Sequence, residues 1–298
     1  MPDIREQEAG TREQEAGTRE RATALHQAIA DLAAAGIPEP RREALLIWSE
    51  LAGPTPGATL VLPDARLSAD LAVRFRQAVA RRAAGEPRQY VVGTVGFRRL
   101  NLGCDRRALI PRPETEGLVD LALARGSTGR ALDLGTGSGC LALALADEAA
   151  YDEVVGIDRS PAALALAREN GTRTGLSVRW VLGDWVKPVS GERFDVIVTN
   201  PPYIAALELR ALHSSVRDWE PEMALNGGPD GLAEARRILT LAPAILRAGG
   251  WLFMELDAAR AAVTAEVATA SGWRAVRVLD DLYRRPRYLA AQWEPDNA

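Results

Sequence analysis

The sequence predicts a doubly wound, mainly parallel α/β sheet preceded by a small bundle of helices. From about Arg112 to the C-terminus, short apolar segments alternate with longer segments of helical periodicity, which is typical of a parallel sheet with helices on both faces. From about Glu20 to Gly85 the apolar spacing is helical throughout, with breaks rich in glycine and proline. We therefore expect two domains of different architecture.

Composition narrows the class of protein. The chain has 298 residues, 47% of them hydrophobic and 26% charged, so it can bury a sizeable core, and its net charge of −4 argues against general nucleic-acid binding. Two cysteines and two histidines, far apart, provide neither a disulfide framework nor the spacing of a metal site. The charged N-terminus and the lack of a long apolar run favour a cytoplasmic protein with no membrane segment.

Four regions are expected along the chain. Residues 1–19 hold the polar heptapeptide REQEAGT twice in succession and are predicted to be disordered. Residues 20–85 are predicted to form the helical domain. Residues 86–110, with β-branched residues and glycines, are predicted as a β-hairpin linker, and residues 111–298 as the α/β domain.

Seven strands are expected in the α/β domain. A sheet of this kind binds its ligand beyond the carboxyl ends of the parallel strands, so the residues that follow each strand are candidates for the site. The expected strands are Ala131–Leu134, Val154–Ile157, Val178–Leu182, Phe194–Thr199, Trp251–Glu255, Trp273–Leu279 and Arg287–Trp293.

The first strand ends in the segment DLGTGSG. Its glycines, Gly135, Gly137 and Gly139, allow the backbone to turn tightly and to approach a ligand in front of a helix N-terminus. Their spacing differs from the Gly-x-Gly-x-x-Gly dinucleotide fingerprint. Asp133, just before the loop, would repel a pyrophosphate and attract a cation. The segment therefore favours a cationic, phosphate-free nucleoside cofactor over NAD.

The next two strand ends provide acidic side chains. Asp158 can accept hydrogen bonds from ribose hydroxyls; alternatively it caps the helix that starts near Pro161, a role that Ser160 could fill instead. Asp184 can accept from an exocyclic amine, and Trp185 is either an apolar wall of the site or a core residue. S-adenosylmethionine combines the ribose, adenine and cationic sulfonium that these residues would recognise.

The fourth strand ends in NPPY, residues Asn200, Pro201, Pro202 and Tyr203. Prolines fix φ and lack an N–H, so the segment is rigid and rich in acceptors; the alternative is an ordinary turn. A planar NH2 group held between the Asn200 side-chain oxygen and the Pro201 carbonyl would be aimed at a methyl sulfonium, and charge developing on its nitrogen would be stabilised. A general base of high pKa would not be needed, because the proton can leave after transfer.

The segments DLGTGSGCLALALA, IPRPETE, NPPYI and VRDWEPEMALNGGPDGL together resemble the HemK/PrmC-type release factor glutamine methyltransferase family, from about Ile37 to the C-terminus. The resemblance implies a class I, Rossmann-like methyltransferase domain with a seven-stranded sheet. It also implies a helical domain that docks a peptide chain release factor, and transfer of a methyl group from S-adenosylmethionine to the glutamine of its Gly-Gly-Gln loop. NPPY alone is shared with enzymes that methylate adenine amines in nucleic acid.

The resulting expectations for the site are specific. The expected catalytic residues are Asn200, Pro201, Pro202 and Tyr203. The expected cofactor contacts are Asp133, Gly135, Thr136, Gly137, Gly139, Asp158, Asp184, Trp185 and Asn200. The expected substrate pocket contains Arg112, Pro113, Glu114 and Phe97.

Two departures from the family pattern leave alternative functions open. Asp257 in ELDAAR and Arg284 in DLYRRPR stand where the family has glycine. Either change alters only the backbone path, or the two mark a different substrate. Methylation of another amide or of an adenine amine, and a binding protein that has lost catalysis, are the alternatives.

Overall fold

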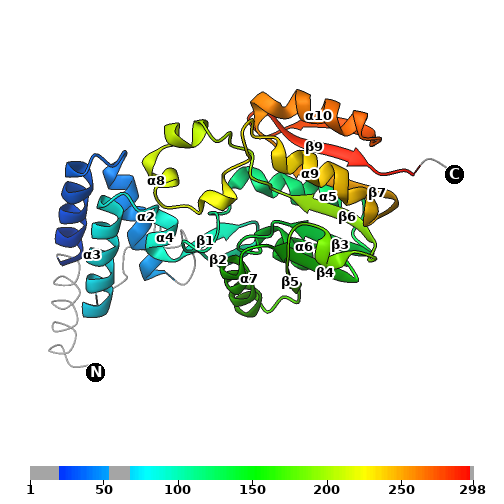
Figure 1. Cartoon of the computed structure of the whole chain (residues 1–298). Coiled ribbons are helices and arrows are strands. Elements are labelled where there is room, and N and C mark those ends of the chain that lie inside the picture. The colour runs from blue at the N-terminus through cyan, green and yellow to red at the C-terminus, as the bar shows by residue number, and fades with distance from the viewer. Residues whose placement is uncertain (1–19, 54–67, 296–298) are drawn as a thin grey trace, which may run out of the picture. The chain divides into compact units, whose positions relative to one another are not determined.

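The computed structural model describes residues 20–53 and 68–295, which form two compact units divided between Thr94 and Val95 (Figure 1). The repeated heptapeptide near the N-terminus lies outside the described residues. Each unit has a hydrophobic core of its own.

The first unit is helical, as predicted. In α3 the buried residues Leu71, Phe75 and Val79 recur at helical spacing, and the ring of Trp48 meets that of Phe75 edge-on at 5.2 Å. Ser68 caps α3 by accepting a hydrogen bond from the Leu71 N–H at 3.1 Å. The described helices are residues 20–34, α2 (Pro40–Ala52), α3 (Ala69–Ala83) and α4 (Arg88–Val92).

The predicted hairpin over residues 86–110 is shorter than expected. Its strands are β1 (Thr94–Phe97) and β2 (Leu100–Gly103), whereas the β-branched stretch before them forms the helix α4. Val91 of α4 is buried in the helical core, and Gly93 ends the helix with φ 79°. Packing thus outweighs the strand preference of adjacent valines.

The second unit contains the predicted seven-stranded sheet, in the order β5-β4-β3-β6-β7-β9-β8. The pairs from β5 to β7 are parallel, and β9 is antiparallel to both of its neighbours. The strands are β3 (Arg130–Leu134), β4 (Glu153–Asp158), β5 (Arg179–Leu182), β6 (Phe194–Thr199), β7 (Leu246–Glu255), β8 (Arg274–Asp280) and β9 (Pro286–Gln292). All seven expected strands are confirmed.

Helices cover both faces of the sheet. Leu132 of β3 points into a core shared with α9 and α10, whereas its neighbour Ala131 points into a core shared with α5 and α6. The helices are α5 (Glu116–Leu123), α6 (Cys140–Glu148), α7 (Pro161–Thr174), α8 (Ser214–Arg217), α9 (Ala233–Leu241) and α10 (Ala261–Ala270). Since β3 pairs with β4 on one side and β6 on the other, the strand order reverses there, and a crevice is expected at their carboxyl ends.

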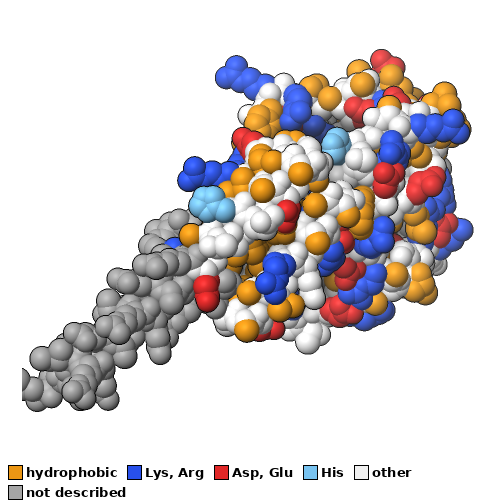
Figure 2. Space-filling view, turned by 90° about the vertical axis from the view of Figure 1, so that its left-hand side faces the viewer, with side chains coloured by type: hydrophobic (Ala, Val, Ile, Leu, Met, Phe, Trp, Pro, Cys, Tyr) orange, Lys and Arg blue, Asp and Glu red, His pale blue; other side chains and the backbone are white. Residues whose placement is uncertain are grey.

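The surface carries charges of both signs. On the face shown in Figure 2, basic and acidic side chains are interspersed with hydrophobic ones. None of the described helices has the length and apolar character needed to cross a membrane.

Candidate active site

A cleft opens at the carboxyl ends of β3, β4 and β6. Its empty volume, including open solvent at the mouth, is about 1030 Å³. The predicted residues that line it are Arg112, Gly135, Thr136, Gly137, Asp158, Asp184, Trp185, Asn200 and Pro202. Nine of the predicted residues therefore lie around one cleft, and their roles there stay predictions.

The glycine loop between β3 and α6 forms one wall. Its three glycines have φ values of 74°, 56° and 85°, all in the left-handed region. A Cβ atom on Gly139 would lie 2.8 Å from the Trp180 ring and 3.2 Å from the Ala167 Cβ, so a larger residue does not fit. The N–H groups of Gly135 and Thr136 both donate to the Ile157 carbonyl at 2.9 Å, which fixes the loop against the end of β4.

Asp133 lies behind this loop, and the cleft-lining residues do not include it. Its Oδ2 atom accepts from the Thr136 hydroxyl at 2.6 Å and from the Ala142 N–H at 3.1 Å. The side chain is buried, its Oδ1 atom has no hydrogen-bond partner, and burial raises its pKa to about 7. Asp133 therefore supports the loop and the first turn of α6 from beneath.

Asp158 is the last residue of β4 and lines the cleft. Its two carboxylate oxygens accept from the N–H groups of Gly137 and Ser160, each at 2.8 Å, and burial raises its pKa. The cap of α7 is Ser160, whose hydroxyl accepts from the Ala163 N–H at 3.2 Å. Ser160 and not Asp158 therefore caps α7, so the alternative role considered for Asp158 is filled by its neighbour.

The third strand end contributes Asp184 and Trp185. Asp184 is paired through Oδ2 with Arg237 at 2.7 Å and with Lys187 at 3.1 Å. The Trp185 indole N–H donates to Glu234 at 2.8 Å. The edge of its ring lies next to Gly135, and the residue is also part of the hydrophobic core. Trp185 is thus both a wall of the cleft and a core residue.

Asn200 stands at the end of β6, with its amide nitrogen hydrogen-bonded to Thr115. Its Nδ2 atom donates to the Thr115 hydroxyl oxygen at 3.1 Å, and that hydroxyl donates to the Glu255 Oε2 atom at 2.6 Å. The Tyr203 hydroxyl donates to Glu255 Oε1 at 3.4 Å. Burial raises the pKa values of Glu255 and Tyr203.

The glycine-rich segment NGGPDG holds the NPPY backbone. The Ile204 N–H donates to the Leu225 carbonyl at 3.0 Å, and the Gly227 N–H donates to the Ile204 carbonyl at 2.8 Å. A Cβ atom on Gly227 would lie 2.8 Å from the Pro202 carbonyl oxygen and equally close to the Tyr203 Cα. Two backbones can approach this closely only because residue 227 is glycine.

Arg112 is the one member of the expected substrate pocket that lines the cleft. It pairs with buried Glu220 at 2.5 Å, and the other oxygen of Glu220 accepts from the Ile110 N–H at 3.1 Å. Pro113 and Glu114 begin a short 3-10 turn outside the cleft lining, where the Glu114 carbonyl accepts from the Tyr288 hydroxyl at 2.6 Å. The IPRPETE segment is thus fastened to distant parts of the domain.

The expectation that Phe97 lines the pocket is wrong. Its side chain is 1% exposed and packs in the core with Leu102, Leu118 and Val119. The residue ends β1, whose apolar face turns inward.

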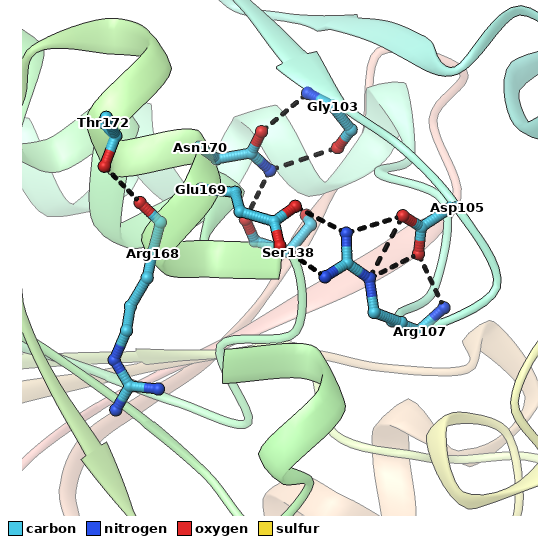
Figure 3. A network of polar contacts seen from close by, with 8 residues as sticks. All are labelled: Gly103, Asp105, Arg107, Ser138, Arg168, Glu169, Asn170 and Thr172. Atoms are coloured by element: carbon cyan, nitrogen blue, oxygen red, sulfur yellow. Dashed lines mark hydrogen bonds and ion pairs between the residues drawn. The ribbon is translucent and has the colours of Figure 1, made fainter. Parts of the chain in front are cut away.

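Asn170 of α7 links the hairpin to the glycine loop, a contact that the sequence did not reveal (Figure 3). Its Oδ1 atom accepts from the Gly103 N–H at 2.6 Å, and its Nδ2 atom donates to the carbonyls of Gly103 at 3.1 Å and of Ser138 at 3.0 Å. In the same view Arg107 bridges Asp105 and Glu169. Asn170 therefore ties β2, α7 and the loop together.

The described residues contain no cluster of metal ligands. Over residues 20–53 and 68–295, no group of three or more His, Cys, Asp or Glu side chains is placed to hold a metal ion.

Comparison with known proteins identifies the family to which the chain belongs. Residues 23–93 match the PrmC N-terminal domain model, and residues 115–218 match the methyltransferase small domain model. A release factor glutamine methyltransferase from Cereibacter sphaeroides is 44% identical over 91% of this chain and 98% of its own length. One from Deinococcus radiodurans is 40% identical over 90% of this chain and 96% of its own.

The chain belongs to the release factor glutamine methyltransferase family. A solved methyltransferase from Pyrococcus furiosus, with a TM-score of 0.52 and 22% identity over 66% of this chain and 90% of its own, shares the fold. The predicted class I methyltransferase fold is confirmed.

One departure from the family pattern follows a strand beside the cleft. Asp257, after β7, has φ −71°, which any residue adopts, and its carboxylate accepts from the Ala259 N–H at 3.0 Å and pairs with Arg260. Glycine is not required by the backbone at this position.

The other departure carries a backbone cost. Arg284 has φ 60°, in the left-handed region, within the turn that joins β8 and β9. The turn is held by Asp281, whose Oδ1 accepts from the N–H groups of Tyr283 at 2.8 Å and Arg285 at 3.0 Å. In a release factor glutamine methyltransferase of this family, glycine would adopt that conformation without strain.

Three buried residues of the site were not identified from the sequence: Thr115, Glu255 and Asn170. Glu255 carried a signal, because an acidic residue closes the apolar strand β7 at the same sheet edge as Asn200. Thr115 and Asn170 carried none, since a Thr in a short turn and an Asn within a helix are ordinary surface residues.

Proposed function

We propose that the protein methylates the side-chain amide nitrogen of a glutamine in a peptide chain release factor, within its Gly-Gly-Gln loop, using S-adenosylmethionine. Two observations support the proposal: the relatives that match nearly the whole chain bear that name, and Asn200 directs its amide nitrogen to Thr115. The second carries the chemistry, because it leaves the Asn200 oxygen to accept from an incoming N–H.

The NPPY segment would act by orientation. An amide nitrogen is a weak nucleophile, since its lone pair is delocalised into the carbonyl. With one N–H on the Asn200 oxygen and the other on the Pro201 carbonyl, the nitrogen is held in one direction and its developing positive charge is stabilised. The N–CH3 bond would form as the sulfonium S–CH3 bond breaks, with a neutral thioether as the leaving group. The methylated nitrogen is then acidic, and its proton passes to solvent without a strong base.

The residues of the cleft suit S-adenosylmethionine, which supplies an electrophilic methyl group on a sulfonium. The glycine loop allows close approach of the ligand. Each oxygen of Asp158 is bonded to one N–H and can accept a second donor, such as a ribose hydroxyl. Asp184 is the weaker fit for the adenine amine, because Arg237 and Lys187 already share its Oδ2. Asp133 would contribute from behind the loop. Because release factors act on ribosomes, we expect the reaction in the cytoplasm.

A methyl-transfer assay with labelled S-adenosylmethionine tests the proposal. Release factor, its Gly-Gly-Gln to Gly-Gly-Ala variant and DNA are supplied in parallel. We expect label on the intact release factor alone. Label on DNA would favour methylation of an adenine amine, and label on both release factors would place the modified residue elsewhere.

The variant Asn200→Ala separates catalysis from binding. It removes the acceptor oxygen, and we expect a loss of turnover of at least roughly a hundredfold, the scale of one orienting donor or acceptor in a preorganised site. Calorimetry with S-adenosylmethionine should show an affinity within a few fold of wild type. Equal activity of the two proteins would remove Asn200 from the mechanism.

A further inference from the structure

Two side chains from segments far apart in sequence meet behind Asn200. Thr115 lies in the turn before α5, and Glu255 ends β7, with 140 positions between them. Thr115 is 2% exposed and Glu255 is 1% exposed, so water does not compete for their hydrogen bonds. The contacts run from Asn200 Nδ2 to the Thr115 oxygen at 3.1 Å and from the Thr115 hydroxyl to Glu255 Oε2 at 2.6 Å.

The direction of these bonds follows from the number of protons available. The Thr115 hydroxyl donates to Glu255 Oε2, and a threonine hydroxyl has one proton. That proton therefore lies in the hydrogen bond to Glu255. The Thr115 oxygen then has only lone pairs to offer Asn200, so it must face the NH2 end of the amide. The Asn200 oxygen is left facing the acceptor.

We propose that Thr115 and Glu255 are positioning residues that fix which end of the Asn200 amide meets the acceptor, and so restrict the enzyme to acceptors that bring N–H groups. This inference rests on the proposed function. It names the feature by which a glutamine amide is distinguished from a side chain of the same shape that brings oxygen acceptors, such as glutamate. Glu255 acts through Thr115, and it also holds the Tyr203 hydroxyl through its other oxygen.

The decisive variant is Thr115→Val, which keeps the shape and removes the hydroxyl. Without it, the Asn200 amide can take either orientation. With labelled S-adenosylmethionine and intact release factor, we expect kcat to fall about 10- to 100-fold while KM for release factor stays within about threefold. Thr115→Ser restores the hydroxyl and should recover most of the rate. If the two variants lose activity equally, the effect is one of packing and the proposal is wrong.

Acceptor discrimination provides a readout that a purely structural role would not change. Wild type should bind release factor far more tightly than its Gly-Gly-Glu variant, because the glutamate oxygens would face the Asn200 oxygen and the Pro201 carbonyl. In Thr115→Val the amide can turn and present its NH2 group, so we expect this affinity ratio to fall by about tenfold or more. An unchanged ratio, in a variant that melts and binds S-adenosylmethionine like wild type, would overturn the proposal.

The affinity ratio also keeps the test independent of folding and of the proposed function. If Thr115→Val melts early, the Thr115→Ser protein is compared with wild type for the Gly-Gly-Gln to Gly-Gly-Glu ratio, which should be retained; a collapsed ratio there counts against the proposal. Failure of the proposed function would show itself earlier, as a wild-type protein that does not label release factor.

Discussion

The two halves of the cleft are built in different ways. The cofactor half, comprising the glycine loop, Asp158 and Asp184, is held largely by bonds to backbone groups: Asp158 accepts from the N–H groups of Gly137 and Ser160, and the Ile157 carbonyl accepts from the N–H groups that begin the loop. The acceptor half, comprising Thr115, Asn200 and Glu255, is held by side chains 85 and 140 positions apart.

This difference decides what each half tolerates. In the cofactor half, backbone conformation and steric room set the shape, so adding a single carbon is harmful. In the acceptor half, hydrogen-bond direction sets the function, so a variant of unchanged shape can be harmful. The two proposals above test the second statement, and the predictions below test the first.

Gly139→Ala should have the largest effect on the folded protein. The residue has φ 85°, and the new Cβ would lie 2.8 Å from the Trp180 ring. The left-handed conformation costs about 1–2 kcal/mol for a residue with a side chain. The clash adds roughly 1–3 kcal/mol to the loss of unfolding free energy. Since the loop must move to relieve it, we also expect at least a tenfold loss of S-adenosylmethionine affinity, measured by calorimetry.

Gly175→Ala is the matched control. This glycine caps α7 with φ 69°, and a Cβ there would meet nothing within 4 Å. Denaturant unfolding should show the backbone cost of about 1–2 kcal/mol alone, with cofactor affinity at the wild-type level. Similar behaviour of the two variants would mean that steric room does not shape the cofactor half.

The fold was readable from the sequence because most of its strands contain short apolar runs, such as VVGI in β4 and VIV in β6, that end at a polar residue. Phe194–Thr199 was predicted with its observed bounds, five other strands agree within one residue at each end, and β7 begins five residues earlier than expected. The helix α4 was not, because adjacent valines favour a strand locally and only the burial of Val91 in the helical core favours a helix.

Asn170→Ala tests a long-range contact within the cofactor half. Asn170 reaches Gly103 across 67 positions and Ser138 across 32 (Figure 3). Its loss leaves buried backbone groups without partners, which costs about 1–3 kcal/mol. Because the Ser138 carbonyl is then no longer held, S-adenosylmethionine binding should weaken by several fold. Thr172→Ala, two residues along the same helix at an exposed position, should leave both quantities near wild type. Cofactor binding unchanged in Asn170→Ala would confine Asn170 to a structural role.

The site could be predicted from the sequence only where its residues stand at the ends of strands. The glycine loop, Asp158 and the NPPY segment each lie at the carboxyl end of a strand, so their meeting at one sheet edge could be predicted. The partners of Asn200 could not, because the sheet order and the path of the turn before α5 bring Thr115 and Glu255 together. Phe97 was misassigned for the same reason: its direction depends on the packing of β1.

Arg284→Gly should have the smallest effect, and it should be stabilising. Arg284 pays for φ 60° with about 1–2 kcal/mol, which glycine avoids, while the greater freedom of glycine in the unfolded chain costs about 0.5–1 kcal/mol. We expect a net gain of roughly 0.5–1 kcal/mol in denaturant unfolding. Leu282→Gly is the control in the same turn: the Leu282 side chain is fully exposed, and the residue does not have a positive φ. Glycine at this position should lower the free energy of unfolding by about 0.5–1 kcal/mol. Neither change should alter the ratio of affinities for Gly-Gly-Gln and Gly-Gly-Glu release factors. If Arg284→Gly shifted that ratio, this turn would belong to the acceptor half, and the departure from the family pattern would be one of substrate choice rather than of backbone geometry.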